Sequence, residues 1–257
     1  MIKYQHIGLY INPSLSTERH QNIKNICNLL SKHAQCYTNI PSLGYPAYPN
    51  NLELIITFGG DGTILSMFRE FPHIQCPVLG VNLGNLGFMT RTSITELVES
   101  LIKPHQIESR IALVLDNAKN IAINDITFTS KKNLKAIDLN IYVDGHFMSR
   151  ITGDGVIIAT PNGSSAYSLS AGGPLIYPTL DVITITPICA HALSARPIVI
   201  PSTSKITVNI PDTENTAVFI DATEQECHET FKIYKRSPDI KWIAFDDHDY
   251  YEILRQK

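Results

Sequence analysis

The hydrophobic pattern of the chain changes character near residue 111, and this change constrains the fold more than any other feature. Before it, short apolar runs typical of buried strands alternate with segments of helical periodicity. Alternating strands and helices favour a parallel sheet and therefore an α/β domain. We expect strands at residues 6–11, 52–58 and 77–81, and helices around 23–30, 64–68 and 94–101.

After residue 111 the helical periodicity ends, and short β-type runs bounded by turn residues follow. The expected strands are 111–115, 121–128, 136–143, 156–159, 182–188, 197–200, 205–210, 217–220 and 230–234. Such a series is typical of an all-β sandwich. The sequence therefore predicts two domains of different class, with a boundary between about residues 105 and 120.

The composition restricts the class of function. The 257 residues are 44% hydrophobic and 18% charged, with a net charge of -3, which does not suit a nucleic-acid surface. No apolar stretch approaches the ~20 residues of a membrane helix, and the first apolar run is too short for a signal peptide. Five cysteines without CxxC spacing favour reduced thiols over zinc or disulfides. We expect a cytoplasmic protein without nucleic-acid or membrane partners.

The loop at residues 59–63, Gly-Gly-Asp-Gly-Thr, lies between an expected strand and an expected helix. Ligands of open parallel sheets bind beyond the carboxyl ends of the strands, and glycines with a helix N-terminus suit a phosphate. A carboxylate would repel that phosphate, so Asp61 indicates a general base or a metal ligand. The alternative is that Asp61 caps the helix and the glycines form a tight turn. The loop matches neither the Walker pattern nor GxGxxG.

Three further polar segments are candidates for ligand binding. Residues 82–88 form a loop after a strand, which either faces the same cleft or is a surface turn. Asn124 and Asp125 interrupt an apolar run, either at a bulge or as nucleotide contacts. Residues 160–174 combine glycines, hydroxyl residues and the ring of Tyr167, which suits a polar ligand with a planar ring, although a flexible surface loop is the alternative. A serine nucleophile is disfavoured because the GxSxG elbow is absent.

Taken together, these segments resemble the NAD kinase family over most of the chain. The matching motifs lie at residues 12–13, 59–63, 82–88, 124–125, 153–176 and 191–197. The loop at 59–63 is shared with diacylglycerol and sphingosine kinases and, in looser form, with phosphofructokinases, whereas the stretch 153–176 is much more specific. A lipid or sugar kinase and a non-catalytic nucleotide sensor remain as alternatives. The first is disfavoured by that stretch, and the second by the intact Asp61.

The resemblance implies a fold and a reaction. The fold is an α/β N-terminal domain with a parallel sheet, Rossmann-like and similar to diacylglycerol kinases and phosphofructokinases, plus an all-β sandwich C-terminal domain. We expect the first to span residues 1–112 with a returning segment 240–257, and the dinucleotide-binding sandwich to span 113–239. The implied transferase moves a phosphoryl group from ATP or another donor to the adenosine 2′-hydroxyl of NAD, giving NADP. We expect Mg²⁺ held mainly by the donor, and a homodimer or homotetramer.

The family's site residues carry over onto matching positions. Asp61 becomes the base that takes the proton of the 2′-hydroxyl, and in family oligomers a neighbouring subunit can supply Asp154. The phosphate loop comprises Gly59, Gly60, Gly62 and Thr63. The implied NAD-binding residues are Asp61, Gly62, Asn124, Asp125, Lys135, Thr152, Asp154, Ser165, Ala166, Tyr167, Ser168, Leu169 and Ser170. No protein metal ligand is expected. Asn162 and Ser165 replace threonines conservatively, whereas Thr223 replaces a glutamine and leaves that contact open.

Overall fold

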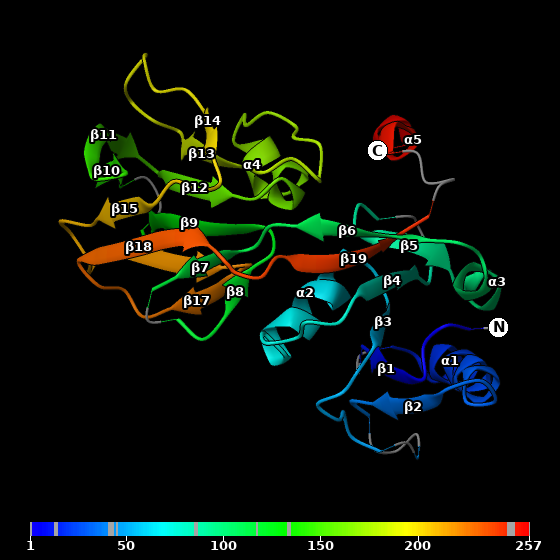
Figure 1. Cartoon of the computed structure of the whole chain (residues 1–257). Coiled ribbons are helices and arrows are strands. Elements are labelled where there is room, and N and C mark those ends of the chain that lie inside the picture. Colours follow the sequence, from blue (N-terminus) through cyan, green and yellow to red (C-terminus); the bar gives the residue numbers. More distant parts are fainter. Residues whose placement is uncertain are drawn as a thin grey trace. The chain divides into compact units, whose positions relative to one another are not determined.

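The computed structural model describes residues 2–12, 15–40, 44, 46–84, 87–116, 118–132, 135–245 and 250–256. The chain divides into two compact units, one of Met1–Ser109 with Ile240–Lys257 and one of Arg110–Asp239 (Figure 1). The first unit is α/β and the second is built from antiparallel sheets, which confirms the predicted fold class.

The described part of the first unit forms a seven-stranded sheet in the order β2-β1-β3-β4-β19-β6, with β5 paired to β4. The pairs among β1, β2, β3 and β4 are parallel, and β19 adds in parallel from the C-terminal segment. The strands are β1 (His6–Ile11), β2 (Gln35–Thr38), β3 (Leu54–Phe58), β4 (Val78–Asn82), β5 (Thr90–Ser93), β6 (Gln106–Arg110) and β19 (Ile240–Ala244).

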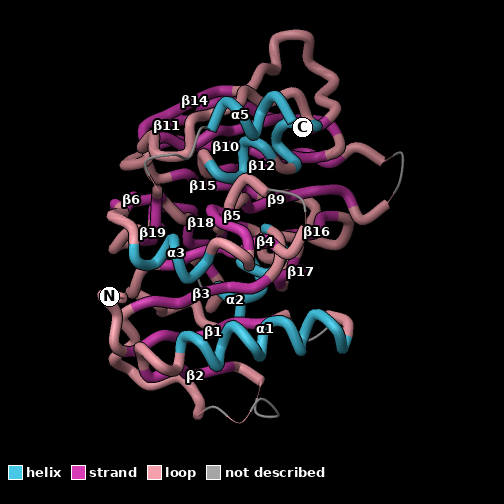
Figure 2. The backbone as a smooth tube through the Cα atoms, turned by 90° about the vertical axis from the view of Figure 1, so that its right-hand side faces the viewer, coloured by secondary structure: helices cyan, strands magenta, loops and turns pink. Residues whose placement is uncertain are grey.

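The helices of this unit bury the apolar stripes that the sequence predicts. In α1 (Thr17–Leu30), which lies beside β1 (Figure 2), Ile23, Cys27 and Leu30 are fully buried. In α2 (Asp61–Glu70) the buried residues include Ile64, Met67 and Phe68. The remaining helices are α3 (Leu97–Ile102) and α5 (Tyr250–Gln256). No helix among the residues that the structure describes is long and apolar enough to cross a membrane.

The predicted start of α3 is wrong. The sequence predicts a helix from about residue 94, and the segment just before it is a strand: β5 continues to Ser93, which pairs with Asn82 of β4. The Ser93 hydroxyl donates to Glu96 Oε2 at 2.8 Å, and the helix begins only at Leu97 without a side-chain cap. Sheet pairing therefore extends to Ser93, and residues 94–96 form a turn before the helix.

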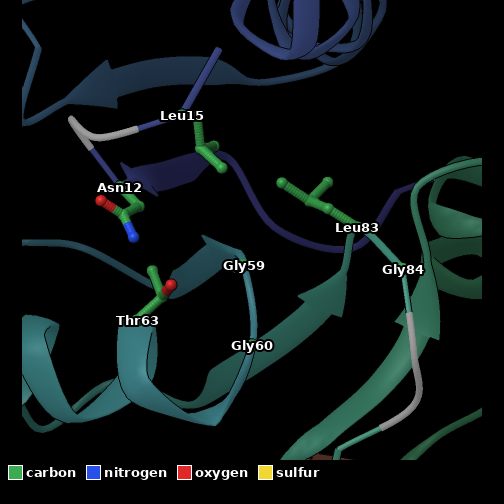
Figure 3. A pocket seen from close by; sticks show the side chains of 7 residues that line it. All are labelled: Asn12, Leu15, Gly59, Gly60, Thr63, Leu83 and Gly84. Carbon is green, nitrogen blue, oxygen red and sulfur yellow. The ribbon is translucent and has the colours of Figure 1, made fainter.

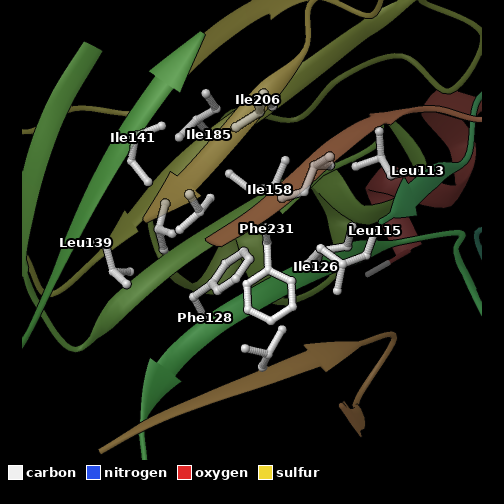
Figure 4. Packing of buried hydrophobic residues seen from close by; sticks show 14 of the residues in the cluster. Leu113, Leu115, Ile126, Phe128, Leu139, Ile141, Ile158, Ile185, Ile206 and Phe231 are labelled. Atoms are coloured by element: carbon white, nitrogen blue, oxygen red, sulfur yellow. The ribbon is translucent and has the colours of Figure 1, made fainter. Parts of the chain in front are cut away.

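The described residues of the second unit form two six-stranded antiparallel sheets, ordered β11-β10-β15-β18-β7-β8 and β14-β13-β12-β9-β16-β17. Its core joins side chains of both sheets, such as Phe128 and Phe231, whose rings lie 5.5 Å apart (Figure 4). The strands are β7 (Leu113–Leu115), β8 (Ile121–Ala122), β9 (Asp125–Ser130), β10 (Ile137–Val143), β11 (His146–Gly153), β12 (Gly155–Ala159), β13 (Val182–Ile188), β14 (Ile198–Pro201), β15 (Ile206–Asn209), β16 (Thr216–Ile220), β17 (Thr223–Gln225) and β18 (Thr230–Lys235).

Two expectations for this unit need correction. The expected strand 121–128 is broken between β8 and β9, where Asn124 lies. Helices also do not stop after residue 111, because the hydroxyl-rich run folds into the short helices η2 (Asn162–Ser165) and α4 (Tyr167–Ser170). Both irregular segments carry predicted ligand-binding residues.

Candidate functional site

The loop at residues 59–63 leads from β3 into the first turn of α2. It lies at the carboxyl edge of the parallel sheet, where β1, β3 and β4 end side by side. A pocket of about 550 Å³ opens there (Figure 3). Its lining comes from the three strand ends and the start of α2, and consists of Asn12, Leu15, Gly59, Gly60, Thr63, Leu83 and Gly84. This is the position at which open parallel sheets bind ligands.

The glycines of this loop have different reasons to be glycine. Gly59 has a φ of +156°, and a β-carbon there would stand 2.7 Å from Thr63 Cβ and closer still to its hydroxyl. At Gly60 and Gly62 a β-carbon would meet nothing within 4 Å. Packing therefore requires glycine only at residue 59. The bare backbone at 60 and 62 leaves room for a ligand to approach closely.

The carboxylate of Asp61 is held from the neighbouring loop. Phe88 N–H donates to Oδ2 and Met89 N–H donates to Oδ1, both at 2.9 Å. The N-cap of α2 is Gly60, without a side-chain capping bond, so the alternative that Asp61 caps the helix is wrong. Two hydrogen bonds orient the half-buried carboxylate and leave further lone pairs for a ligand.

Gly87 makes this arrangement possible. A β-carbon at residue 87 would stand 2.8 Å from Asp61 Cγ and closer still to Oδ1. Its N–H donates to the fully buried hydroxyl of Thr90 at 2.9 Å. The loop at 82–88 thus contacts the acid and is not a plain surface turn, although Asn85 and Leu86 lie outside the described residues. The sequence indicated this loop as a candidate ligand-binding segment, but it did not predict the hydrogen bonds from the loop to Asp61.

In the second unit, Asn124 and Asp125 form a turn that Asp221 holds. Asp221 Oδ2 accepts from Ile123 N–H at 2.7 Å, and Oδ1 accepts from Asn124 N–H at 2.8 Å and Asp125 N–H at 3.0 Å. The side-chain oxygen of Asn124 is buried without a hydrogen-bond partner among the described residues. Sequence reasoning missed Asp221, whose only local signal is its place two residues before Thr223.

Asp125 lies in an environment that disfavours its charged form. Its side chain is buried, and the Thr127 hydroxyl donates to Oδ1 at 3.0 Å. Burial first, and the charge of Asp221 second, raise the pKa of Asp125 to about 7. At neutral pH this carboxyl group can therefore act as hydrogen-bond donor or acceptor.

The hydroxyl-rich run divides into inward and outward side chains. Ser168 is fully buried and hydrogen-bonds Thr186 at 2.9 Å, and the Ser165 hydroxyl donates to Asn162 O at 3.1 Å. Tyr167 is 47% exposed. The other members of the run differ in the same way: Ala166 is half-buried, and Leu169 and Ser170 are exposed. The outward side chains are the ones that a ligand can reach.

Tyr167 shares its surroundings with other predicted site residues. The pKa of its hydroxyl is raised by burial first, and then by the nearby Cys189, Asp154 and Asp125. Asp154 is exposed at the turn between β11 and β12, where its N–H donates to Ile188 O at 3.0 Å. The structure therefore brings the tyrosine ring and two carboxyl groups into one neighbourhood.

Lys135 and Thr152 are engaged elsewhere. Lys135 Nζ lies 3.5 Å from Asp212 Oδ2, and the Thr152 hydroxyl donates to Asp138 Oδ1. Within the part of the chain that the structure describes, no hydrogen bond or ion pair links either residue to Tyr167. The same residues contain no group of three or more His, Cys, Asp or Glu that could hold a metal ion.

Comparison with known proteins yields one family for both units. Residues 4–106 match the family model of the ATP-NAD kinase N-terminal domain, and residues 123–236 match that of the ATP-NAD kinase C-terminal domain. A Clostridium beijerinckii protein named NAD kinase is 35% identical, with 98% of this chain and 94% of the relative covered. A Clostridium tetani protein of the same name is 40% identical over 80% of this chain and 81% of its own.

Two solved structures are also similar. Yeast NADH kinase complexed with NADH gives a TM-score of 0.86 at 26% identity, covering 98% of this chain and 87% of its own. An NAD kinase from Archaeoglobus fulgidus in complex with ATP gives a TM-score of 0.78 at 25% identity, covering 98% of both chains.

Proposed function

The chain belongs to the NAD kinase family, and from that premise we propose that Asp61 is the general base of its phosphoryl transfer. Family membership makes the protein a phosphotransferase with a hydroxyl of NAD as acceptor. The observation that carries the role of Asp61 is its carboxylate, which two backbone N–H groups orient next to Gly60, a residue that lines the pocket.

In the proposed reaction, the 2′-oxygen of the adenosine ribose attacks the terminal phosphorus of the donor. A new oxygen–phosphorus bond forms, the bond to the leaving diphosphate breaks, and Asp61 takes the hydroxyl proton. Phosphoryl transfer depends mainly on positioning and on charge stabilisation. A base within hydrogen-bond reach contributes about 10²–10⁴-fold to such a step.

The donor phosphates would occupy the pocket at the start of α2. Three features support this: the bare backbone at Gly60 and Gly62, the N–H groups at the start of the helix, and the positive end of the helix dipole. The similar Archaeoglobus fulgidus kinase was solved in complex with ATP. We therefore propose ATP as a donor.

The second unit would bind the dinucleotide through the turn at Asn124 and Asp125, the carboxylate of Asp154 and the run from Ser165 to Ser170. The exposed ring of Tyr167 offers a stacking surface, and the unpartnered oxygen of Asn124 offers an acceptor. The similar yeast kinase was solved with NADH. Lys135 and Thr152 would contact NAD only after they exchange their present protein partners for the ligand, because Asp212 and Asp138 now bind them.

Magnesium fits this site only as a companion of the donor. The described residues offer no ready cage, but the carboxylate of Asp61 is a hard oxygen ligand beside the phosphate pocket. We propose that Mg²⁺ would be held mainly by the donor phosphates. When bound, the ion neutralises phosphate charge.

Location and assembly follow from other features. All five cysteines are free thiols, which supports a reducing cytoplasm. The second unit exposes several large apolar side chains, which supports their burial in a homodimer or homotetramer. They include Leu175, Tyr177, Leu180 and Leu193.

The test is incubation of the protein with ATP, Mg²⁺ and each of four acceptors: NAD, diacylglycerol, sphingosine and fructose 6-phosphate. Chromatographic detection of NADP with NAD alone is the expected result. Phosphorylation of a lipid or sugar in place of NAD would identify a different kinase. No product from any acceptor would identify a nucleotide sensor. Repeating the NAD assay with other nucleotides and polyphosphate defines the donor range.

A further inference from the structure

The carboxylate of Asp221 holds the backbone of three consecutive residues, 123–125. It accepts their three N–H groups at 2.7, 2.8 and 3.0 Å, and Asp221 N–H donates to Asp125 O at 3.0 Å. We propose that Asp221 is a positioning residue that presents the side chains of Asn124 and Asp125 to NAD. This inference rests on the proposed function, because it concerns the acceptor-binding pair.

The conformation of residue 221 serves this contact. Asp221 and Ala222 form the two-residue connection of the β16–β17 hairpin, and Ile220 pairs directly with Thr223. Their φ angles are +44° and +63°, as a type I′ turn requires. Alanine is an unfavourable residue for the left-handed conformation that Ala222 adopts. The hairpin therefore contains a strained turn, and the side chain of Asp221 in this turn points to residues 123–125.

The other side of the Asn124 turn is equally fixed. Thr160 N–H donates to Asn124 O at 2.9 Å, and a β-carbon at Gly163 would stand 2.5 Å from the carbonyl carbon of Asn124. With its backbone held on both sides, the turn can vary only in its side chains. The unpartnered oxygen of Asn124 accepts hydrogen bonds, so it suits a carboxamide N–H or a ribose hydroxyl of the dinucleotide.

A carboxylate suits residue 221 better than an amide does. Three N–H donors converge on it, and an ionised carboxylate has only acceptors, whereas asparagine would turn an N–H₂ group toward a donor. The groups that face Asp125 are Asp221 from the hairpin, Thr127 from its own strand and Tyr167 from α4. Removing the charge of Asp221 should therefore lower the pKa of Asp125.

The test compares Asp221→Asn with Asp144→Asn. Asp144 is a matched control, because it also has a positive φ, of +51°, and its Oδ1 accepts a backbone N–H, from Lys205 at 2.8 Å. In Asp221→Asn we expect the KM for NAD to rise about tenfold. The KM for ATP should stay within about twofold, since the donor pocket belongs to the other unit. Asp144→Asn should leave both values unchanged.

A pH series separates positioning from general destabilisation. We measure the affinity for NAD by calorimetry, without donor, as a function of pH. The midpoint of this pH dependence should lie at lower pH in Asp221→Asn than in the unmodified protein. Equal affinity and an equal midpoint would overturn the inference, as would a parallel rise in both KM values. If Asp221→Asn does not fold, Asp221→Glu takes its place. This variant should raise the KM for NAD and keep the midpoint of the pH dependence. An unchanged KM for NAD in Asp221→Glu would also overturn the inference. Failure of the unmodified protein to make NADP would instead reject the proposed function.

Discussion

The α-carbon of Gly87 lies against the carboxylate of Asp61, so that a β-carbon at residue 87 would stand 2.8 Å from Asp61 Cγ. The next two residues, Phe88 and Met89, donate their N–H groups to the same carboxylate. The position of the acid in one loop thus depends on the missing side chain in another.

Gly87→Ala should therefore lower kcat although Gly87 carries no chemistry. The added methyl group would displace the carboxylate from its two donors, and we expect a loss of about 10–100-fold, within the range of a misplaced catalytic group. Steady-state kinetics at saturating NAD and ATP measures it. Gly8→Ala is the control, because the three atoms nearest to its β-carbon would belong to the side chains of Ile55, Leu52 and Tyr48, with Ile55 Cγ1 at 3.0 Å. That variant should lower the melting temperature but not kcat, and equal kcat losses would refute the explanation.

Asp61→Asn should retain NAD binding and lose nearly all turnover. Asparagine keeps the shape of the side chain but cannot take a proton, so we expect kcat to fall by at least about 10²-fold. Calorimetry with NAD and single-turnover kinetics separate the two effects. Glu70→Gln, at the opposite end of the same helix, should have normal kcat. If Asp61→Asn kept most of the kcat of the unmodified protein, Asp61 would not be the general base.

Asp125→Asn should change how stability depends on pH. The folded pKa of about 7 lies above the ordinary carboxyl value of 3.8, so the protonated form stabilises the fold. This contribution is complete below about pH 4 and is lost as pH rises through 7. Asparagine does not titrate, so the stability of the unmodified protein relative to the variant should fall between pH 4 and 8. Thermal melts across that range measure the difference, and a constant difference would contradict a raised pKa.

Tyr167→Ala should weaken NAD binding without destabilising the fold. The ring is 47% exposed, so its loss removes little packing, whereas stacking on a base is worth about 1–3 kcal/mol. We expect the KM for NAD to rise about tenfold or more at an unchanged melting temperature. Tyr234→Ala, at 41% exposure in the same unit, is the control. Similar kinetics for the two variants would show that the Tyr167 ring does not contact NAD.

Chelation with EDTA should abolish activity, and added MgCl₂ should restore it. The described residues contain no group of three or more metal-ligating side chains, so the ion should contribute nothing to the ligand-free fold. The melting temperature of the ligand-free protein should therefore be the same with and without EDTA. A lower melting temperature in EDTA would indicate a structural metal.

The hydrophobic pattern predicted those strands whose own residues show that they are buried. The expected ranges 6–11 and 182–188 match β1 and β13, because the first is an apolar run and the second alternates isoleucine with threonine, and both patterns mark strands. The pattern did not predict β11, whose first residues are exposed or half-buried and which exists because it pairs with β10. It also misplaced the start of α3, which pairing of β5 with β4 decides.

By itself, the sequence determined the chemical types and their approximate places: an acid within a glycine loop after a buried strand, and a hydroxyl-rich run among β-strands. Only the tertiary structure decided what holds them. Asp61 is oriented by residues 27 and 28 positions away, and Asn124 by Asp221, 97 positions away. The same structure turned Ser168 inward and Tyr167 outward. The reason is that hydrogen bonds between distant segments depend on which strands pair, and local periodicity does not specify that pairing.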